Sequence, residues 1–242
     1  MSTENGLRAF LRLVLLSGVL LVASRASAQE QLRQADSLFA IGQYLSAQQL
    51  YKTQLDKSFR PIVLLKLAYI AELNGDYTQS LYYLTVLSKR SPSEAIYQKM
   101  EALGLKYRLN GYTFDDFGYF ILYVKKYGQG LFVVLIVIAG YLLSELLIKY
   151  SKNESITFVP KAIVVLFLLG LLLVLNLNEL FEEGIVANDT TFLRNSPSSA
   201  SSVVGTISKG NKVIVLGKRD HWKLVLLKGK FVYIKQDDLL LI

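Results

Sequence analysis

The sequence predicts a multi-domain membrane protein in three parts: a helical region, a two-helix transmembrane hairpin and a small all-β barrel. Two long apolar stretches, 130–149 and 158–177, are separated by a short polar connection, and each has about the 20 residues that a helix needs to cross a bilayer. In the preceding 29–126, apolar residues recur at helical spacing. In 184–242, short β-rich runs alternate with turn residues.

Residues 1–28 have the pattern of a secretory signal peptide. Arg8 and Arg12 precede the apolar stretch 13–23, and Ala26-Ser27-Ala28 provides small residues at a cleavage site. The apolar stretch is too short to span a bilayer comfortably. Cleavage after Ala28 is therefore expected, with an uncleaved anchor as the alternative. In both cases the residues that follow are exported.

The helical region contains a repeated pattern. Gly42-Gln43-Tyr44 and Gly75-Asp76-Tyr77 lie 33 residues apart, and a glycine can release the chain at a turn between two helices. This pattern resembles the tetratricopeptide repeat, a helix-turn-helix unit of about 34 residues. A third, degenerate copy is expected, with helices at 93–109 and 114–126. Aromatic residues 112–127 are expected to cap the array or to lie at the bilayer interface. The small residues expected where paired helices approach are Ala35, Ala47, Ala68 and Ser80.

The resemblance to the tetratricopeptide repeat implies a binding groove for a peptide or a partner protein. By analogy, the first helix of each unit lines the groove, which points to Asp36 and Phe39 in the first copy and to Tyr69 and Glu72 in the second. The alternative is that these are ordinary solvated or helix-capping residues.

The two apolar stretches predict helices because only a helix or a closed barrel satisfies its backbone within lipid. The first contains a single charged residue, Glu145, which can extend to the head groups. The alternative, two helices buried in a soluble core, is disfavoured by their length. Lysines in and beside the connecting loop, 150–157, place that loop in the cytoplasm. Together with the signal peptide, this predicts a two-pass protein of the bacterial inner membrane with both soluble regions on the periplasmic side.

The C-terminal region resembles the bacterial SH3-like domain. The resemblance rests on Phe192-Leu193-Arg194, Val204-Gly205-Thr206-Ile207, Lys209-Gly210 and Trp222, and it implies a ligand face around Arg194, Trp222 and Tyr233. Val232-Tyr233-Ile234 stands where the family usually has Gly-Trp-Val, so a flexible glycine and a large ring of the family's ligand pocket are missing here. Trp222 is favoured as a core residue, with a ligand platform as the alternative. The expected strands are 184–187, 191–194, 203–207, 212–218, 222–227 and 230–235.

The sequence offers no site for catalysis. It has no cysteine and one histidine, His221, which excludes zinc sites with several histidine or cysteine ligands. Glu179, Glu182 and Glu183 are expected to form a solvated collar on a juxtamembrane helix, rather than an acid pair. We therefore expect no enzyme, no cofactor and no metal. The net charge of +8 is scattered rather than gathered into one stripe, which disfavours nucleic acid as a partner.

These features predict a non-catalytic envelope scaffold that recruits protein partners at the inner membrane. The order of the parts resembles the E component of the Bacteroides aerotolerance (Bat) operon. This implies partners among other Bat operon products, including von Willebrand factor A-type membrane proteins, in a complex tied to stress tolerance. The alternatives are a membrane-anchored module that binds peptidoglycan, and an accessory subunit of a wall hydrolase or transporter. The basic C-terminal region could also face anionic membrane lipid.

Overall fold

A computed structural model describes residues 29–55, 59–113, 116–152, 158–176, 182–227 and 229–242. The chain divides into two compact units, Met1–Asp76 and Tyr77–Ile242. The expected signal peptide, residues 1–28, lies outside the described residues, as do Glu179 and part of the loop between the two apolar stretches.

The first unit is helical. A helix over residues 29–40 is followed by α2 (Tyr44–Leu55) and α3 (Pro61–Leu73). Ala35 and Ala47 are fully buried, as expected for small residues at a close helix–helix approach. The turn between the first two helices has Gly42 at φ +79°, a conformation in which a residue without a Cβ is unstrained. Pro61 begins α3, where its missing N–H leaves no helix hydrogen bond unmade.

The turn at Gly42 recurs 33 residues later. Gly75 has φ +75°, and α4 (Tyr77–Arg90) begins two residues after it, as α2 does after Gly42. The helix-turn-helix geometry at both glycines was thus predicted correctly, and α4 ends before Pro92 as expected. Membership of the tetratricopeptide family remains a prediction.

The expected third copy is wrong in its second helix. Its first helix is present as α5 (Glu94–Lys106), but the described residues of the expected second helix, 116–126, are the beginning of α6 (Asp116–Ser151). This 36-residue helix contains no proline, and glycines such as Gly128 lower helix stability without breaking a helix. Nothing in the sequence therefore ends the helix before the apolar stretch begins.

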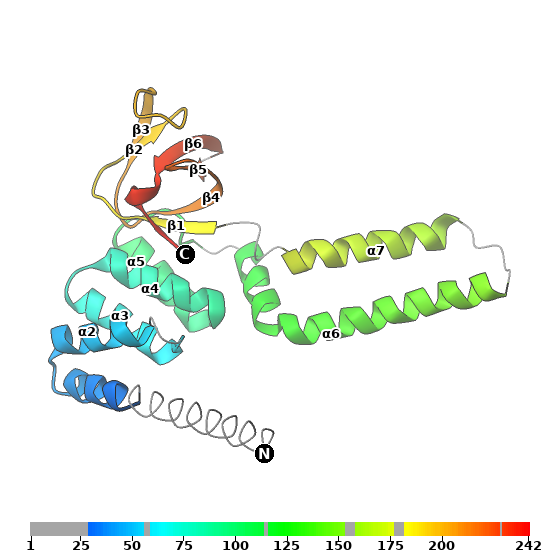
Figure 1. The fold of residues 1–242 in the computed structure, drawn as a ribbon, viewed down its shortest axis with the longest axis horizontal. Helices are drawn as coiled ribbons and strands as arrows, with labels where there is room; N and C mark the ends of the chain where they lie inside the picture. Colours follow the sequence, from blue (N-terminus) through cyan, green and yellow to red (C-terminus); the bar gives the residue numbers. More distant parts are fainter. Residues whose placement is uncertain (1–28, 56–58, 114–115, 153–157, 177–181, 228) are drawn as a thin grey trace, which may run out of the picture. The chain divides into compact units, whose positions relative to one another are not determined.

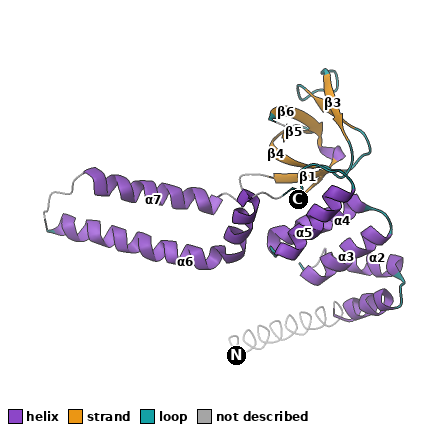
Figure 2. Cartoon of the chain, turned by 180° about the vertical axis from the view of Figure 1, so that it is seen from behind, coloured by secondary structure: helices purple, strands orange, loops and turns teal. Residues whose placement is uncertain are grey.

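Both apolar stretches are helical. After α6, α7 spans Phe158–Asn176, and the two helices lie side by side in both views (Figures 1 and 2). Among the described residues, one segment, Phe132–Ser151, is long and apolar enough to cross a membrane. Large apolar side chains on both helices, such as Val137 and Leu166, are exposed, which does not fit the alternative of two helices buried in a soluble core. That both helices cross a membrane remains a prediction.

The C-terminal region is an antiparallel sheet of seven strands in the order β3-β2-β6-β5-β4-β1-β7. Four of the six predicted strands have the expected bounds; β1 begins two residues and ends one residue earlier than expected, and β4 ends one residue later. The short 3-10 helix η1 (Gln236–Asp238) and β7 were not predicted. The bounds are β1 Glu182–Val186, β2 Thr191–Arg194, β3 Val203–Ile207, β4 Lys212–Arg219, β5 Trp222–Leu227, β6 Lys230–Lys235 and β7 Leu239–Leu241.

The core of this domain is aliphatic. Val225 and Ile234 are fully buried at its centre, and Leu193, Val213 and Val232 belong to the same cluster. Alternation along each strand directs these side chains inward and their neighbours outward. The domain therefore has an inner face that stabilises the fold and an outer face available for contacts.

The expected acidic collar is wrong for Glu182 and Glu183. Both belong to β1 rather than to a helix, and both face basic residues of the sheet. The Glu182 carboxylate accepts a hydrogen bond from Lys223 Nζ at 2.6 Å, and that of Glu183 one from Lys212 Nζ at 3.4 Å. The two acids thus form ion pairs that help to attach β1 to the sheet.

Candidate binding surfaces

In the first unit, Asp36 is held by two neighbours. Its carboxylate accepts a hydrogen bond from Tyr51 Oη at 2.6 Å and one from Lys66 Nζ at 2.8 Å. Burial raises the pKa of Asp36, but the hydrogen bonds from Lys66 and Tyr51 and the charge of Lys66 outweigh it, so the pKa is lowered. Asp36 is therefore ionised at neutral pH. It joins the 29–40 helix to α2 and α3.

Aromatic rings surround this ion pair. The Phe39 ring centroid lies 5.5 Å from that of Tyr44 and 5.8 Å from that of Tyr69, and Lys66 Nζ lies 5.3 Å from the Phe39 ring centroid. Tyr69 is 48% exposed. Edge-to-face and tilted arrangements of this kind are the preferred geometry for aromatic rings. The group forms an aromatic surface, part of which faces solvent.

The predicted groove residues are thus partly brought together. Asp36, Phe39 and Tyr69 belong to one cluster, and Glu72 follows Tyr69 by almost one turn of α3. Asp36 has intramolecular partners, so it contributes to helix packing in addition to any contact with a ligand. Tyr69 is the member best placed for binding, since half of its side chain is open to solvent.

In the β domain, Arg194, Trp222 and Tyr233 also lie together. Arg194 is paired with Tyr233 across β2 and β6, and its guanidinium carbon lies 5.8 Å from the Trp222 ring centroid. Arg194 also donates a hydrogen bond to the carbonyl oxygen of Ser201 at 2.6 Å. Trp222 is only 8% exposed, which does not fit an open ligand platform, but it is not part of the aliphatic core cluster either.

A separate apolar groove of about 600 Å³ lies nearby. The predicted ligand-face residues Arg194, Trp222 and Tyr233 are not among its lining residues, although Arg194 lies between two of them. Sequence reasoning missed this groove, because it depends on how β3 and the β5–β6 hairpin are placed, and only exposed apolar residues such as Phe231 could have indicated it. The groove is lined by Leu193, Asn195, Val204, Leu227, Gly229, Lys230, Phe231 and Val232.

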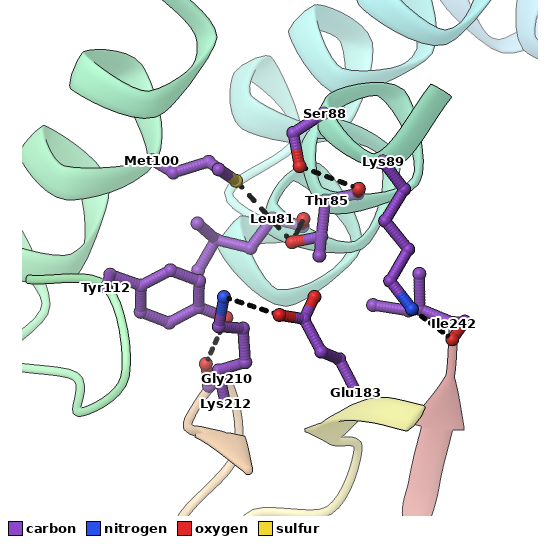
Figure 3. Close-up of polar contacts among 10 residues, drawn as sticks. All are labelled: Leu81, Thr85, Ser88, Lys89, Met100, Tyr112, Glu183, Gly210, Lys212 and Ile242. Atoms are coloured by element: carbon purple, nitrogen blue, oxygen red, sulfur yellow. Dashed lines mark hydrogen bonds and ion pairs between the residues drawn. The ribbon is translucent and has the colours of Figure 1, made fainter. Parts of the chain in front are cut away.

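The second unit also contains a junction between the segment that precedes α6 and the turn that precedes β4 (Figure 3). Tyr112 Oη donates a hydrogen bond to the Gly210 carbonyl oxygen at 2.8 Å. The Asn110 backbone N–H donates to Asn211 Oδ1 at 2.8 Å, and the Lys212 N–H donates to the Asn110 carbonyl at 3.1 Å. We call residues 110–112 with 210–212 the junction.

The junction is closely packed. A Cβ on Gly104 would lie 2.7 Å from Tyr112 Cβ, and one on Gly111 would lie 2.6 Å from the Lys212 carbonyl oxygen. Burial raises the pKa of Tyr112, and the charge of Glu183 raises it further. Tyr112 was expected to cap the helical array or to lie at the bilayer interface. It instead attaches the helices to the β domain.

A further contact joins α4 to the end of the sheet. Lys89 Nζ donates a hydrogen bond to the backbone oxygen of Ile242 at 2.7 Å (Figure 3). Ile242 is itself attached to β1, because its N–H donates to the Glu183 carbonyl oxygen at 2.9 Å. The junction is therefore supported by a second contact on α4.

Comparison with known proteins identifies the class of the β domain. Residues 189–239 match the family model of the bacterial SH3 domain, which confirms that part of the expected fold. The match begins after β1 and ends at the first residue of β7. No curated protein matches the chain. Bacterial SH3 domains commonly bind proteins or peptidoglycan, so the grouping of Arg194 with Trp222 and the apolar groove are both candidate contact surfaces.

Proposed function

We propose that this chain is a non-catalytic scaffold of the bacterial inner membrane. In this proposal α6 and α7 cross the bilayer as a hairpin, and both soluble regions lie on the periplasmic side. The helical region and the SH3 domain recruit envelope or membrane proteins. Other Bat operon products are the first candidates, because the order of the parts resembles the E component of that operon.

The junction is the observation that carries the membrane topology of this proposal. Asn110 and Tyr112 precede α6, whereas Gly210 and Asn211 follow α7, yet the two segments are hydrogen-bonded to each other. Segments in direct contact must lie on the same side of a bilayer. If α6 crosses the membrane, the chain must cross back before residue 210, and α7 is the apolar helix available for this.

The exposed aromatic surface around Tyr69 supports a role in binding. Tyrosine side chains with a solvent-exposed part of the ring are enriched at protein interfaces, since they combine a large apolar area with a polar tip. The ion pair of Asp36 with Lys66 holds the neighbouring helices, so the surface is largely preformed. A preformed surface loses little entropy on binding.

The topology can be tested with single cysteines, because the natural chain has none. Ala95→Cys in α5, Lys218→Cys in β4 and Lys152→Cys after α6 all replace exposed residues. In spheroplasts, a membrane-impermeant maleimide should label positions 95 and 218 but reach position 152 only after lysis. Labelling of position 95 or 218 only after lysis would contradict the proposed orientation.

Recruitment can be tested by co-purification in mild detergent. The wild-type chain should retain membrane partners in stoichiometric amounts, and the double variant Tyr69→Ala/Glu72→Ala should lose them. The matched control is Tyr123→Ala, which removes another half-exposed tyrosine, located on α6. If the double variant retains as much partner protein as the control, the helical region is not part of the proposed interface.

Binding to peptidoglycan is a second candidate function. The groove beside Lys230 favours it, because a basic residue next to an apolar groove suits a peptide that carries carboxylates. The full chain in detergent should then sediment with purified peptidoglycan sacculi, and Phe231→Ala should weaken this binding. Sedimentation with sacculi together with no co-purifying protein would favour this function over the scaffold.

A further inference from the structure

The outer face of the β4–β5–β6 sheet has an apolar end and a basic end. Residues paired across neighbouring strands point to the same side of a sheet. On β5 and β6, Val225 and Val232 point into the core, so Leu226 and Phe231, each one residue away, point outward. This outer face can therefore be followed strand by strand from the register.

One end of this face is an exposed apolar row. Ile214 is paired with Leu226, and Leu226 is paired with Phe231. Their exposed fractions are 42%, 36% and 63%. Single exposed apolar residues are normal on protein surfaces, but an aligned set across three strands forms a continuous patch of the kind found at interaction sites.

The other end of the same face is basic. Arg219 is paired with Trp222, and Trp222 is paired with Lys235, while Arg194 lies over the Trp222 ring. The apolar and basic rows are four residues apart along β5 and β6, which corresponds to about 13 Å. The face thus changes from apolar to cationic along the strands, with Leu224 and Tyr233 between the two rows.

The connection to α7 keeps this face close to the end of that helix. Ile214 is paired with Glu183 of β1, so the apolar row begins one strand away from the start of the domain. Helix α7 ends at Asn176 and β1 begins at Glu182, a separation that a chain can stretch to at most ~20 Å. A domain held this closely meets the surface of the bilayer at high effective concentration.

The charge of the domain favours an anionic surface. Residues 182–242, which include β1, contain nine lysines and arginines against six aspartates and glutamates. Basic residues are attracted to the negative surface potential of anionic lipids, and apolar and aromatic residues beside them insert at the head-group level. The short connection between α7 and β1 keeps the bilayer within reach of this face at all times, whereas a protein partner would have to bind from solution.

We propose that the β4–β5–β6 face docks on the surface of the membrane that α6 and α7 cross. The apolar row of Ile214, Leu226 and Phe231 enters the interface, and Arg219 and Lys235 contact anionic head groups. This inference rests on the membrane hairpin of the proposed function. It adds a specific orientation of the SH3 domain, with its β4–β5–β6 face turned toward the lipid.

The test uses nitroxide spin labels on single cysteines in the full chain, reconstituted into vesicles. Ile214→Cys reports on the apolar row, and Val137→Cys in α6 reports on the hairpin. Vesicles contain either phosphatidylcholine alone or phosphatidylcholine with phosphatidylglycerol. In the anionic vesicles, the label at position 214 should lose collisions with a water-soluble nickel complex and gain collisions with oxygen. This change should be absent or smaller in the neutral vesicles.

Charge reversal tests the basic row. Arg219→Glu/Lys235→Glu should return the label at position 214 to water in anionic vesicles. The control Lys52→Glu/Lys106→Glu makes the same change in net charge at exposed residues of α2 and α5 and should leave the label in place. Salt at about 1 M shortens the Debye length to about 3 Å. It should therefore return the label at position 214 to water in the chain that has no charge reversal.

The outcomes separate the two proposals. If the label at position 137 is deep in lipid while that at position 214 stays in water in both kinds of vesicle, the docking inference is overturned and the hairpin stands. If position 214 is shielded from both nickel and oxygen, a protein surface covers the row, which also overturns the inference. If position 137 is exposed to water, the hairpin itself fails and the docking inference fails with it.

Discussion

Two tyrosines of this chain, Tyr112 and Tyr69, show how differently the same side chain can be used. Tyr112 is 1% exposed, and its hydroxyl group donates to a backbone carbonyl of the β domain. Tyr69 is 48% exposed and contacts the rings of Phe39 and Tyr44. The difference lies in the surroundings: Gly104 leaves room for the Tyr112 ring, and Gly210 supplies an acceptor. A buried polar tip with a backbone partner marks a structural tyrosine, and an exposed ring marks one available for binding.

The largest effect is expected from closing the space at the junction. Gly111 has φ +90°, and a Cβ there would lie 2.6 Å from the Lys212 carbonyl oxygen. In Gly111→Ala the backbone must shift, because neither atom belongs to a flexible side chain. We expect a loss of about 3 kcal/mol in local stability. Amide hydrogen exchange in nanodiscs should show faster exchange at residues 107–113 and 209–212.

Gly229 provides a matched control for that substitution. It has φ +76°, but a Cβ there would meet nothing within 4 Å. Gly229→Ala should therefore show the conformational cost alone, about 1 kcal/mol. If Gly111→Ala costs no more than Gly229→Ala, the close approach at Lys212 contributes nothing to the junction.

A smaller effect is expected when the Tyr112 hydroxyl group is removed. Tyr112→Phe keeps the ring but leaves the buried Gly210 carbonyl oxygen without this donor, at a cost of about 1–2 kcal/mol. Thermal unfolding of the detergent-solubilised chain should report the change. Tyr123→Phe, a hydroxyl deletion at a half-exposed tyrosine, should have almost no effect. An unchanged midpoint for Tyr112→Phe would show that the hydrogen bond is not stabilising.

Tyr112 should also make the junction sensitive to high pH. Burial, together with the charge of Glu183, raises its pKa in the folded chain above the ordinary value of about 10. Above pH ~10 the unfolded state loses this proton more readily than the folded state, so stability falls as pH rises. Below that pH the contribution of Tyr112 is fully present. Hydrogen exchange at the junction between pH 9 and 11, corrected for the intrinsic rate, should show this loss, and Tyr112→Phe should reduce it.

The sequence predicted the elements better than their contacts. Helices and strands follow from local signals: the spacing of apolar residues predicts each type, and Gly42 and Gly75 have the positive φ expected of their turns. The pairing of Asn110 with Asn211 involves residues 101 positions apart. No periodicity relates such residues, so the junction could not be predicted. The same limit applies to the groove, which requires residues of β2 and β3 to be placed near the β5–β6 hairpin.

The errors in the prediction have physical reasons as well. Glu182 and Glu183 were assigned to a helical collar because acids near a membrane span are usually solvated. Their actual partners, Lys223 and Lys212, come from strands further along the chain. Of the predicted ligand-face residues, Arg194 and Tyr233 are neighbours because β2 and β6 are paired, an arrangement that the resemblance to the SH3 fold supplied. Composition alone does not predict that Arg194 and Tyr233 are neighbours.

A still smaller effect on stability is expected at Tyr69. Tyr69→Ala removes ring contacts with Phe39 and Tyr44 from a half-exposed position, at a cost of about 1 kcal/mol or less. This change should not unfold the helices, whereas binding of partners should be lost. Hydrogen exchange of residues 59–73 measures the stability, and co-purification measures the binding. Loss of both together would show that Tyr69 is structural, like Tyr112.

The smallest effect concerns Asp36 at low pH. The hydrogen bonds from Lys66 and Tyr51 and the charge of Lys66 lower its pKa despite the opposing effect of burial, so its contribution is present above the ordinary value of about 4 and is lost as pH falls below it. The carboxylate side chain is 46% exposed, which screens the interaction and keeps the contribution small. Hydrogen exchange of residues 29–55 should accelerate between pH 5 and 3, after correction for the intrinsic rate. Asp36→Asn should remove this acceleration while leaving the junction unchanged, because residues 110–112 and 210–212 belong to the other unit. An equal acceleration in the variant would mean that another group carries the acid sensitivity of the helices.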